Sequence, residues 1–381
     1  MTKSSSAHAP NEHYAQTALI LQGGGALGSY QAGVYESLDA QGIYPDWFAG
    51  ISIGSINAAI MAGNSPDQRV AQLRAFWRDI TEHFPDYSNP FQGAFARHLY
   101  ASLSSLHSIA FGVPDFFVPR TPPAWMRMPG ADGANSFYDT APLRETLHRY
   151  IDFDMINDPK SPRLSLGAVN VHTGNFTYFD NRNLVIGPEH VMASGALPPG
   201  FPPVEIDGEY YWDGGLVSNT PLAYALNKLD GDDTLIFQVD LFSAVGCFPE
   251  TIEDVEERRK DIIYSSRTRL NTDAFREKYK LRRDLLALAK RLPERDRKDP
   301  AIAALIPEKK GRKVSIVHLI YRRSVYDGSS KDYEFSRRTM EEHWMAGFDD
   351  GKRTLRSKDW REPPSDEDGI ATYDLTRSGT A

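Results

Sequence analysis

The sequence predicts an α/β protein in which a mainly parallel sheet is covered by helices on both faces, followed by a mostly helical C-terminal extension. Within residues 16–241, short apolar runs typical of strands alternate with longer runs typical of helices. Such alternation is the pattern of parallel sheets. Glycine-rich turns join the first two strand-like runs to the helices that follow them. After residue 241 the helical pattern dominates, with one strand-like run at 313–321.

The individual elements follow from apolar spacing. The predicted strands cover residues 18–21, 47–51, 164–171 and 235–241. The predicted helices cover residues 29–40, 53–62, 67–81 and 141–151. The chain then divides into a polar lead (1–15), a motif-bearing region (16–241), a helical extension (242–358) and a polar tail (359–381). We expect the lead and the tail to be disordered, because polar chain ends with few apolar residues have little to pack.

Composition excludes several classes of protein. The 381 residues include 43 basic and 51 acidic side chains, and the net charge of −8 argues against nucleic-acid binding, which needs a basic surface. The single cysteine, Cys247, excludes an internal disulfide and a multi-thiolate metal site. Residues 1–13 lack an apolar signal core, and no apolar run reaches the roughly 18 residues of a membrane span. We therefore expect a cytoplasmic enzyme without metal or cofactor, with peripheral membrane association or non-classical export left open.

The first glycine-rich turn has glycine at Gly23, Gly24, Gly25 and Gly28, directly after the first strand-like run. Consecutive glycines leave backbone N–H groups open to a ligand, at an entropic cost that a plain turn does not need. The spacing also fits the dinucleotide-binding fingerprint, which requires an acidic residue about 20 positions on, after the second strand. Asp46 lies at about that distance but before the second strand, so a dinucleotide-binding oxidoreductase stays a remote alternative.

The second turn is a candidate nucleophile elbow. Gly50 and Gly54 flank Ser52, between the second strand-like run and a helix. A sharp strand-to-helix turn needs small residues at these two positions and exposes the serine at its apex. The helix N-terminus favours negative charge there, and the N–H of Ile53 is a candidate oxyanion donor together with the glycines of the first turn.

A third motif supplies a carboxylate. Asp213 is followed by Gly214 and Gly215 after a strand-like run at 209–211. Alone, an aspartate before two glycines is often only a turn. In this order, however, the three motifs resemble those of the patatin-like phospholipase family. The segments 138–147 and 192–203 are also similar to that family.

This resemblance runs from about Ala18 to Asp240, and residues 335–351 resemble a subgroup with an added C-terminal region. It implies a lipid acyl hydrolase with a Ser–Asp dyad, in which Ser52 is the nucleophile and Asp213 the general base. It also implies that the three consecutive glycines line the oxyanion hole. The family usually has a basic residue where this chain has Leu27, and its absence favours a neutral ester over a phospholipid.

The sequence leaves a second catalytic mechanism and other functions open. A Ser52–Asp213–His318 triad has the chain order of α/β-hydrolases, but His318 lies inside the strand-like run 313–321. An acyltransferase or a hydrolase of storage lipid or polyester would use the same fold, and a catalytically silent interaction protein is a further possibility.

Two stretches are candidates for contact with lipid. Residues 84–134 are rich in proline, glycine and aromatic residues, which predicts a lid or acyl-chain channel. Residues 279–292 place Leu281, Leu285, Leu288 and Leu292 on one helical stripe among basic residues, a pattern that either packs on a core or lies on a membrane. The expected partner is a lipid or other acyl ester, and a homo-oligomer is compatible with the sequence.

Overall fold

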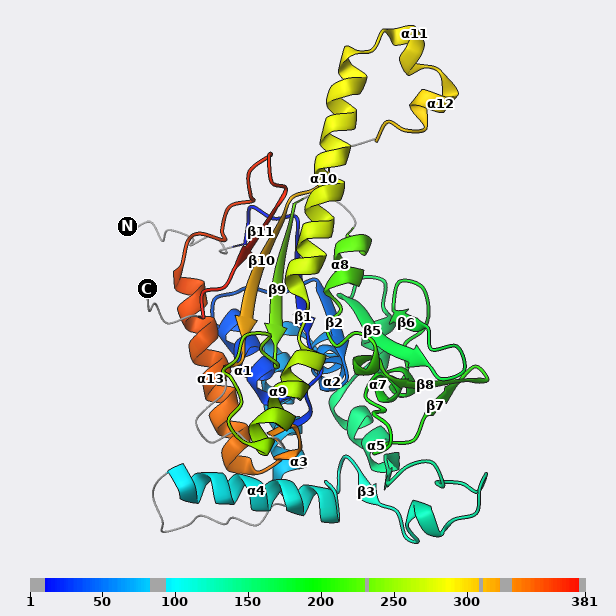
Figure 1. The fold of residues 1–381 in the computed structure, drawn as a ribbon, viewed down its shortest axis with the longest axis vertical. Helices are drawn as coiled ribbons and strands as arrows, with labels where there is room; N and C mark the ends of the chain where they lie inside the picture. The colour runs from blue at the N-terminus through cyan, green and yellow to red at the C-terminus, as the bar shows by residue number, and fades with distance from the viewer. Residues whose placement is uncertain (1–10, 83–93, 230–232, 308–310, 323–330, 377–381) are drawn as a thin grey trace, which may run out of the picture.

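One mixed sheet forms the centre of the computed structural model, which describes residues 11–82, 94–229, 233–307, 311–322 and 331–376 (only the backbone for 94–99). Its strands are β1 (Gln16–Leu21), β2 (Trp47–Ile51), β5 (Arg163–Asn170), β6 (Phe176–Asp180), β7 (Val204–Ile206), β8 (Glu209–Asp213), β9 (Thr234–Asp240), β10 (Val314–Ile320) and β11 (Ile370–Tyr373). Among the described residues the order is β11-β10-β9-β1-β2-β5-β8-β7, and β6 also pairs with β5 (Figure 1). The pairs from β11 to β5 are parallel, which confirms the predicted fold class, and β6, β7 and β8 are antiparallel.

Helices cover both faces of this sheet. They are α1 (Gly28–Asp39), α2 (Ile53–Ala62), α3 (Pro66–Glu82), α4 (Ala94–Phe111), α5 (Ala141–Tyr150), α6 (Phe153–Asn157), α7 (Pro188–Ser194), α8 (Leu222–Lys228), α9 (Ile252–Tyr264), α10 (Thr268–Arg291), α11 (Glu294–Arg297), α12 (Pro300–Ala303) and α13 (Arg337–Arg356). Short 3₁₀ turns are η1 (Gly25–Leu27), η2 (Ala124–Met126), η3 (Gly214–Leu216) and η4 (Lys331–Tyr333), and β3 (Val118–Pro119) pairs with β4 (Tyr138–Asp139) as a separate ribbon.

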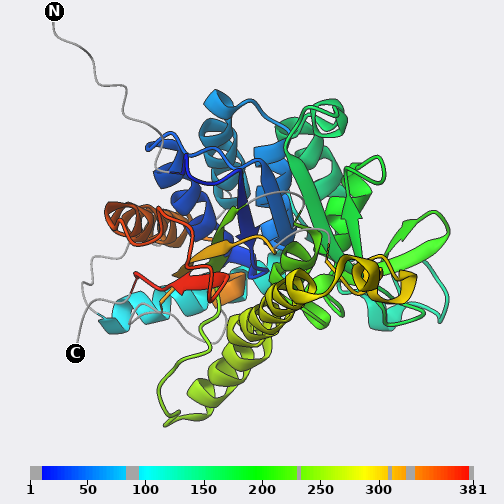
Figure 2. The same cartoon turned by 90° about the horizontal axis from the view of Figure 1, so that it is seen from above.

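The alternation of side chains along β1 builds two cores. Leu19 and Leu21 belong to a large core shared with α1, α2, α3 and α13. Ala18 and Ile20 point to the other face, into a smaller core with α8 and with Phe275 of α10. Figure 2 shows α10, in yellow, on the far side of the sheet from α1, in blue. Because the strand is buried on both faces, its sequence is continuously apolar.

The C-terminal residues complete the sheet. Strands β10 and β11 extend it beyond β9, and α13 packs along α1. This helix pair is very close: a Cβ on Gly33 would lie 1.9 Å from the carbonyl oxygen of Trp344, and one on Gly347 would lie 2.0 Å from that of Tyr30. Residues beyond 241 therefore share one core with the residues before it.

Both expected disordered ends contain ordered residues. Tyr14 is buried and its hydroxyl donates to the carbonyl oxygen of Trp360 (2.6 Å). Trp360 is itself fully buried, and Ile370–Tyr373 forms β11. The tail was expected to be disordered because it is polar, but an edge strand needs only one buried face, so its sequence carries a weak apolar signal. Residues 1–10 and 377–381, also part of that expectation, lie outside the described residues, as do residues 84–93 of the expected lid.

No helix among the described residues combines the length and the apolar character needed to cross a membrane.

Candidate active site

Ser52 stands at a strained turn between β2 and α2. Its φ is +55° and its ψ −126°, a conformation that L-residues rarely adopt. The flanking glycines make this turn possible, because a Cβ on Gly50 would lie 2.3 Å from the carbonyl oxygen of Gly54. A Cβ on Gly54 would lie 2.5 Å from the carbonyl oxygen of Leu21. The spacing of the two glycines is therefore a steric requirement of the turn that presents the serine.

Helix α7 fixes the position of the Ser52 turn through hydrogen bonds. The N–H of Ser52 donates to the carbonyl oxygen of Ser194 (3.1 Å) and to its hydroxyl (3.2 Å). The Ser194 hydroxyl in turn donates to the carbonyl oxygen of Gly167 in β5 (2.6 Å). Ser194 lies in the segment 192–203, which resembles the family, but this role of Ser194 was not predicted from the sequence. No local pattern points to this role, because it depends on a contact across 142 positions of sequence.

Asp213 lies at the end of β8, facing the serine. It is 2% exposed, and burial raises the pKa of its carboxyl from 3.8 to about 7. Hydrogen bonds from the Gly215 N–H (2.7 Å to Oδ1) and from the Ser52 hydroxyl act in the opposite direction and lower this pKa. A Cβ on Gly214 would meet the carbonyl oxygen of Gly167 at 2.7 Å, so the glycine lets the turn approach β5 closely.

The glycine turn after β1 forms another wall of the cavity that contains Ser52 and Asp213. Its three glycines differ in their hydrogen bonds and backbone conformation. The N–H of Gly23 donates to the carbonyl oxygen of Asn219 (3.2 Å), so the expected oxyanion donor at Gly23 is already used. Gly24 and Gly25 border the cavity in front of Ser52. Gly25 has a φ of +54°, and a Cβ there would lie 2.2 Å from the carbonyl oxygen of Asp332.

Ile53 completes this wall from α2. As the first residue of the helix, it has no intrahelical acceptor for its N–H. Gly28 brings α1 against it, because a Cβ on Gly28 would lie 2.5 Å from Cγ1 of Ile53. The candidate oxyanion donors are therefore Gly24, Gly25 and Ile53.

Two amides fix the position of this wall. The side chain of Asn219 donates to the carbonyl oxygens of Gly23 (3.0 Å) and Tyr264 (3.2 Å). Gln22 is fully buried, and its Oε1 accepts from the N–H groups of Leu241 (2.6 Å) and Phe242 (2.8 Å). Buried amides with several partners rigidify a loop. Sequence patterns missed both residues, since asparagine and glutamine are common and their partners are distant in sequence.

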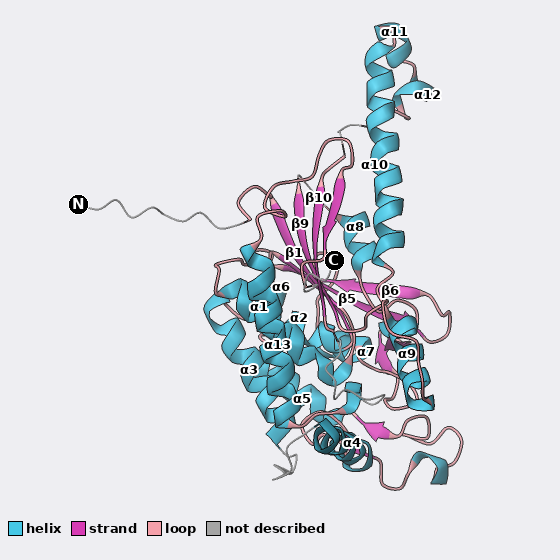
Figure 3. Ribbon diagram, turned by 60° about the vertical axis from the view of Figure 1, so that its left-hand side comes forward, coloured by secondary structure: helices cyan, strands magenta, loops and turns pink. Residues whose placement is uncertain are grey.

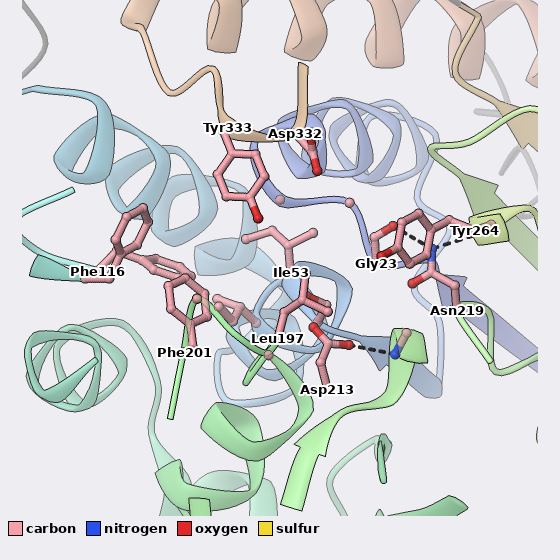
Figure 4. Close-up of a pocket in the computed structure, with 18 of the residues that line it drawn as sticks. Gly23, Ile53, Phe116, Leu197, Phe201, Asp213, Asn219, Tyr264, Asp332 and Tyr333 are labelled. Carbon is pink, nitrogen blue, oxygen red and sulfur yellow. Dashed lines mark hydrogen bonds between the residues drawn. The ribbon is translucent and has the colours of Figure 1, made fainter. Parts of the chain in front are cut away.

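A cavity of about 90 Å³ connects these groups, and its walls are largely aromatic. Figure 4 shows Phe116 and Phe201 on one side of it, and Asn219 and Tyr264 on the other. Phe117 packs on Phe201 with ring centroids 5.0 Å apart. Because these side chains are apolar and close to the serine, the cavity suits a hydrocarbon chain.

The C-terminal part of the chain closes the cavity. Asp332 and Tyr333 of η4 line it, as does Phe335, which comes just before α13 (Figure 4). The buried Lys331 anchors η4 by ion pairs with Glu257 and Asp261 of α9 (3.2 and 3.1 Å). These lining residues were not found from sequence, because they lie about 280 positions beyond Ser52.

Two residues considered from sequence lie elsewhere. His318 is on β10, where its Nε2 lies 2.6 Å from Oδ2 of Asp240, and it is not among the cavity-lining residues. Asp46 precedes β2, at the amino end of the parallel strands, and accepts a hydrogen bond from the N–H of Thr17 (3.1 Å). Nucleotides bind at the carboxyl ends of such strands, so Asp46 does not fit a ribose-binding role. Within the described parts of the chain, no three His, Cys, Asp or Glu side chains gather as a metal site.

The fold and the site together define an α/β protein that presents a serine on a sharp turn between a strand and a helix. Comparison with known proteins agrees. A family model described as patatin-like phospholipase matches residues 19–226, more than half of the chain, and a second, described as patatin phospholipase, matches residues 262–367. The chain belongs to the patatin-like phospholipase family.

The other comparisons add little. No curated protein matches the chain. Among solved structures, VipD from Legionella pneumophila is similar with 15% sequence identity and a TM-score of 0.40. The match covers 89% of this chain and 66% of the VipD chain, so this chain spans less than two thirds of that protein.

Proposed function

We propose that this protein hydrolyses neutral acyl esters with a Ser52–Asp213 dyad. The observation that carries the proposal is the buried carboxyl of Asp213 beside a serine on a strained turn, with a pKa raised to about 7. An ordinary aspartate, with a pKa near 4, is a weak base at neutral pH, whereas a pKa near the working pH is the favourable value for a general base.

In the proposed reaction, the Oγ of Ser52 bonds to the acyl carbon while Asp213 accepts the hydroxyl proton. The N–H groups of Gly24, Gly25 and Ile53 donate to the oxyanion that develops, a kind of interaction typically worth 100- to 1,000-fold in turnover for each donor, by order of magnitude. Asp213 then returns the proton to the leaving alcohol. Water attacks the acyl-enzyme, Asp213 accepts its proton, and the free acid leaves as Ser52 regains its hydrogen.

The charges around the cavity support a neutral substrate. Among the described residues that line it there is no lysine, arginine or histidine. Leu27, which replaces the basic residue usual in the family, is fully buried. Lys260 lies nearby, but its Nζ already pairs with Asp332 (2.8 Å). A phosphate head group would therefore find no free cation among the described lining residues, and an acylglycerol or another uncharged ester avoids that cost.

The test is an ester panel on the wild type and on Ser52→Ala. We expect Ser52→Ala to lower ester turnover by several orders of magnitude with the fold intact, and to abolish labelling by an activated phosphonate. Within the panel, a diacylglycerol should have a higher kcat/KM than phosphatidylcholine with the same acyl chains. Wild-type turnover in folded Ser52→Ala would contradict the assignment of Ser52 as the nucleophile. A preference for phosphatidylcholine would contradict the proposal of a neutral substrate.

A further inference from the structure

Over residues 101–111 of helix α4, whose side chains the structure describes, serines are buried and leucines are exposed, although the preceding Tyr100 is also buried. The buried face of the helix carries Ser104, Ser105 and Ser108, each at most 4% exposed. Its outer face carries Leu103 and Leu106, which are 45% and 61% exposed. A helix on the surface of a globular domain normally buries its apolar stripe. This helix buries hydroxyl groups and presents leucines, which indicates that something apolar covers its outer face.

The segment after α4 also exposes large apolar side chains. Trp125 and Met126 of η2 are 74% and 70% exposed, and Met128 is 78% exposed. Phe111, at the end of α4, is also exposed. Figures 1 and 3 both place α4 at the end of the molecule away from the tip of α10, and Figure 1 places β3 at that same end. The docking face, as we name it, consists of Leu103, Leu106, Phe111, Trp125, Met126 and Met128.

The docking face is joined to the cavity. Phe116 and Phe117, between its two halves, line the cavity wall. The hydroxyl of Tyr138, another lining residue, donates to the carbonyl oxygen of Ile109 in α4 (2.7 Å). The N–H of Tyr138 donates to the carbonyl oxygen of Gly200, beside Phe201 (2.9 Å). An acyl chain leaving a lipid layer at this face would therefore meet the aromatic wall directly.

The charge of this segment fits a lipid surface. Between residues 100 and 137, two arginines balance two aspartates, and His107 is the one other side chain that ionises near neutral pH. The whole chain has a net charge of −8. The segment thus lacks the acidic excess that a lipid surface, often anionic, would repel. Tryptophan beside methionine is also suited to a membrane interface, where amphipathic rings are enriched.

We propose that this protein docks on lipid surfaces through the docking face, which places the cavity over its substrate. The inference rests on the proposed function, since a lipid-ester hydrolase must reach a substrate that is held in a lipid layer. The proposal assigns the lipid contact to residues 103–128 and not to the leucine stripe at 279–292. Most of that stripe lies on α10, and the tip of α10 is at the end of the molecule away from α4 (Figure 1).

The experiment measures flotation of the full chain with vesicles of ether-linked phosphatidylcholine, which contain no acyl ester, alone or mixed with ether-linked phosphatidylglycerol. The test variants are Leu106→Asp and Trp125→Asp. The matched controls are Leu281→Asp and Leu288→Asp, at leucines of α10 that are 62% and 55% exposed. We expect about tenfold weaker vesicle binding for each test variant, because each loses a large buried apolar side chain at the interface, and wild-type binding for the controls.

A short-chain, water-soluble ester separates this proposal from the proposed function. The test variants should keep wild-type turnover on that ester, and circular dichroism should show an unchanged fold. Vesicle binding without any ester turnover would contradict the proposed hydrolase activity and would still support docking through this face. Turnover without vesicle binding, or loss of binding only in the α10 variants, would overturn the docking face. A wild-type dimer that Leu106→Asp dissociates, with no vesicle binding, would assign the face to a second copy and equally overturn it.

Discussion

Replacing Asp213 by asparagine should stabilise the protein above neutral pH while abolishing turnover. The carboxyl is 2% exposed, and burial raises its pKa from 3.8 to about 7. At about 1.4 kcal/mol per pH unit, a rise of this size corresponds to about 4 kcal/mol of cost for ionising the folded protein. Asparagine has the same shape, keeps an oxygen for the N–H of Gly215, and has no charge to bury.

The size of this stabilisation depends on pH. Between 3.8 and about 7, the folded protein holds the Asp213 proton and the unfolded chain has released it. The native state then binds more protons, so the free energy of unfolding of the wild type falls as pH rises through this window. Below it the carboxyl is protonated in both states and costs nothing. The advantage of Asp213→Asn should therefore grow from near zero at about pH 4 to at most about 4 kcal/mol above about pH 8.

Urea unfolding of the two proteins across this pH range measures the difference directly. Other groups titrate in the same window, including Asp46, whose pKa burial raises to about 6. They are present in both proteins and cancel in the comparison. Ser52→Ala is the control, because it removes catalysis and keeps the buried carboxyl. It also removes the hydrogen bond that lowers the Asp213 pKa, so its stability should fall with pH as in the wild type and level off at a higher pH. Parallel stability curves for wild type and Asp213→Asn would refute the reasoning, since they would mean that the carboxylate is not desolvated.

Three further predictions concern the same region. Turnover of a soluble ester should rise with pH through about 7 and then level off, because only the ionised form of Asp213 accepts the proton from the serine. Gly54→Ala should destabilise the protein by about 1–3 kcal/mol and impair turnover, as its Cβ would lie 2.5 Å from the carbonyl oxygen of Leu21. His318→Ala should cost about 1–3 kcal/mol of stability, because the buried Asp240 loses a hydrogen-bond partner, yet should leave turnover per folded molecule near that of the wild type.

Each of these predictions has a control and an opposing result. Turnover that is highest in acid and declines through neutrality would contradict Asp213 as the base. For the glycine, Gly195→Ala is the matched control, because the nearest atom to its Cβ would be 3.8 Å away. Equal stability of the Gly54 and Gly195 variants in urea would contradict the steric argument. Collapse of ester turnover in folded His318→Ala would favour the triad instead of the dyad.

The sequence by itself determined the elements that local chemistry encodes. The parallel sheet followed from continuously apolar runs such as 18–21, since a strand buried on both faces cannot alternate. The elbow followed from Gly50, Ser52 and Gly54, because the strained turn has no room for Cβ atoms at its flanks. These signals are short-range, so a few neighbouring residues suffice to carry them.

Only the tertiary structure decided how the site is assembled. Gly23 was expected to donate to an oxyanion, but its N–H is bound by the carbonyl oxygen of Asn219, almost 200 positions away. The pKa of Asp213 depends on burial, and the cavity wall needs Asp332 and its neighbours from beyond residue 330. The polar tail was expected to be disordered, yet it supplies an edge strand because β10 offers it a partner. Burial and hydrogen-bond partners come from segments that meet only after folding, and no local pattern in the sequence specifies which segments those are.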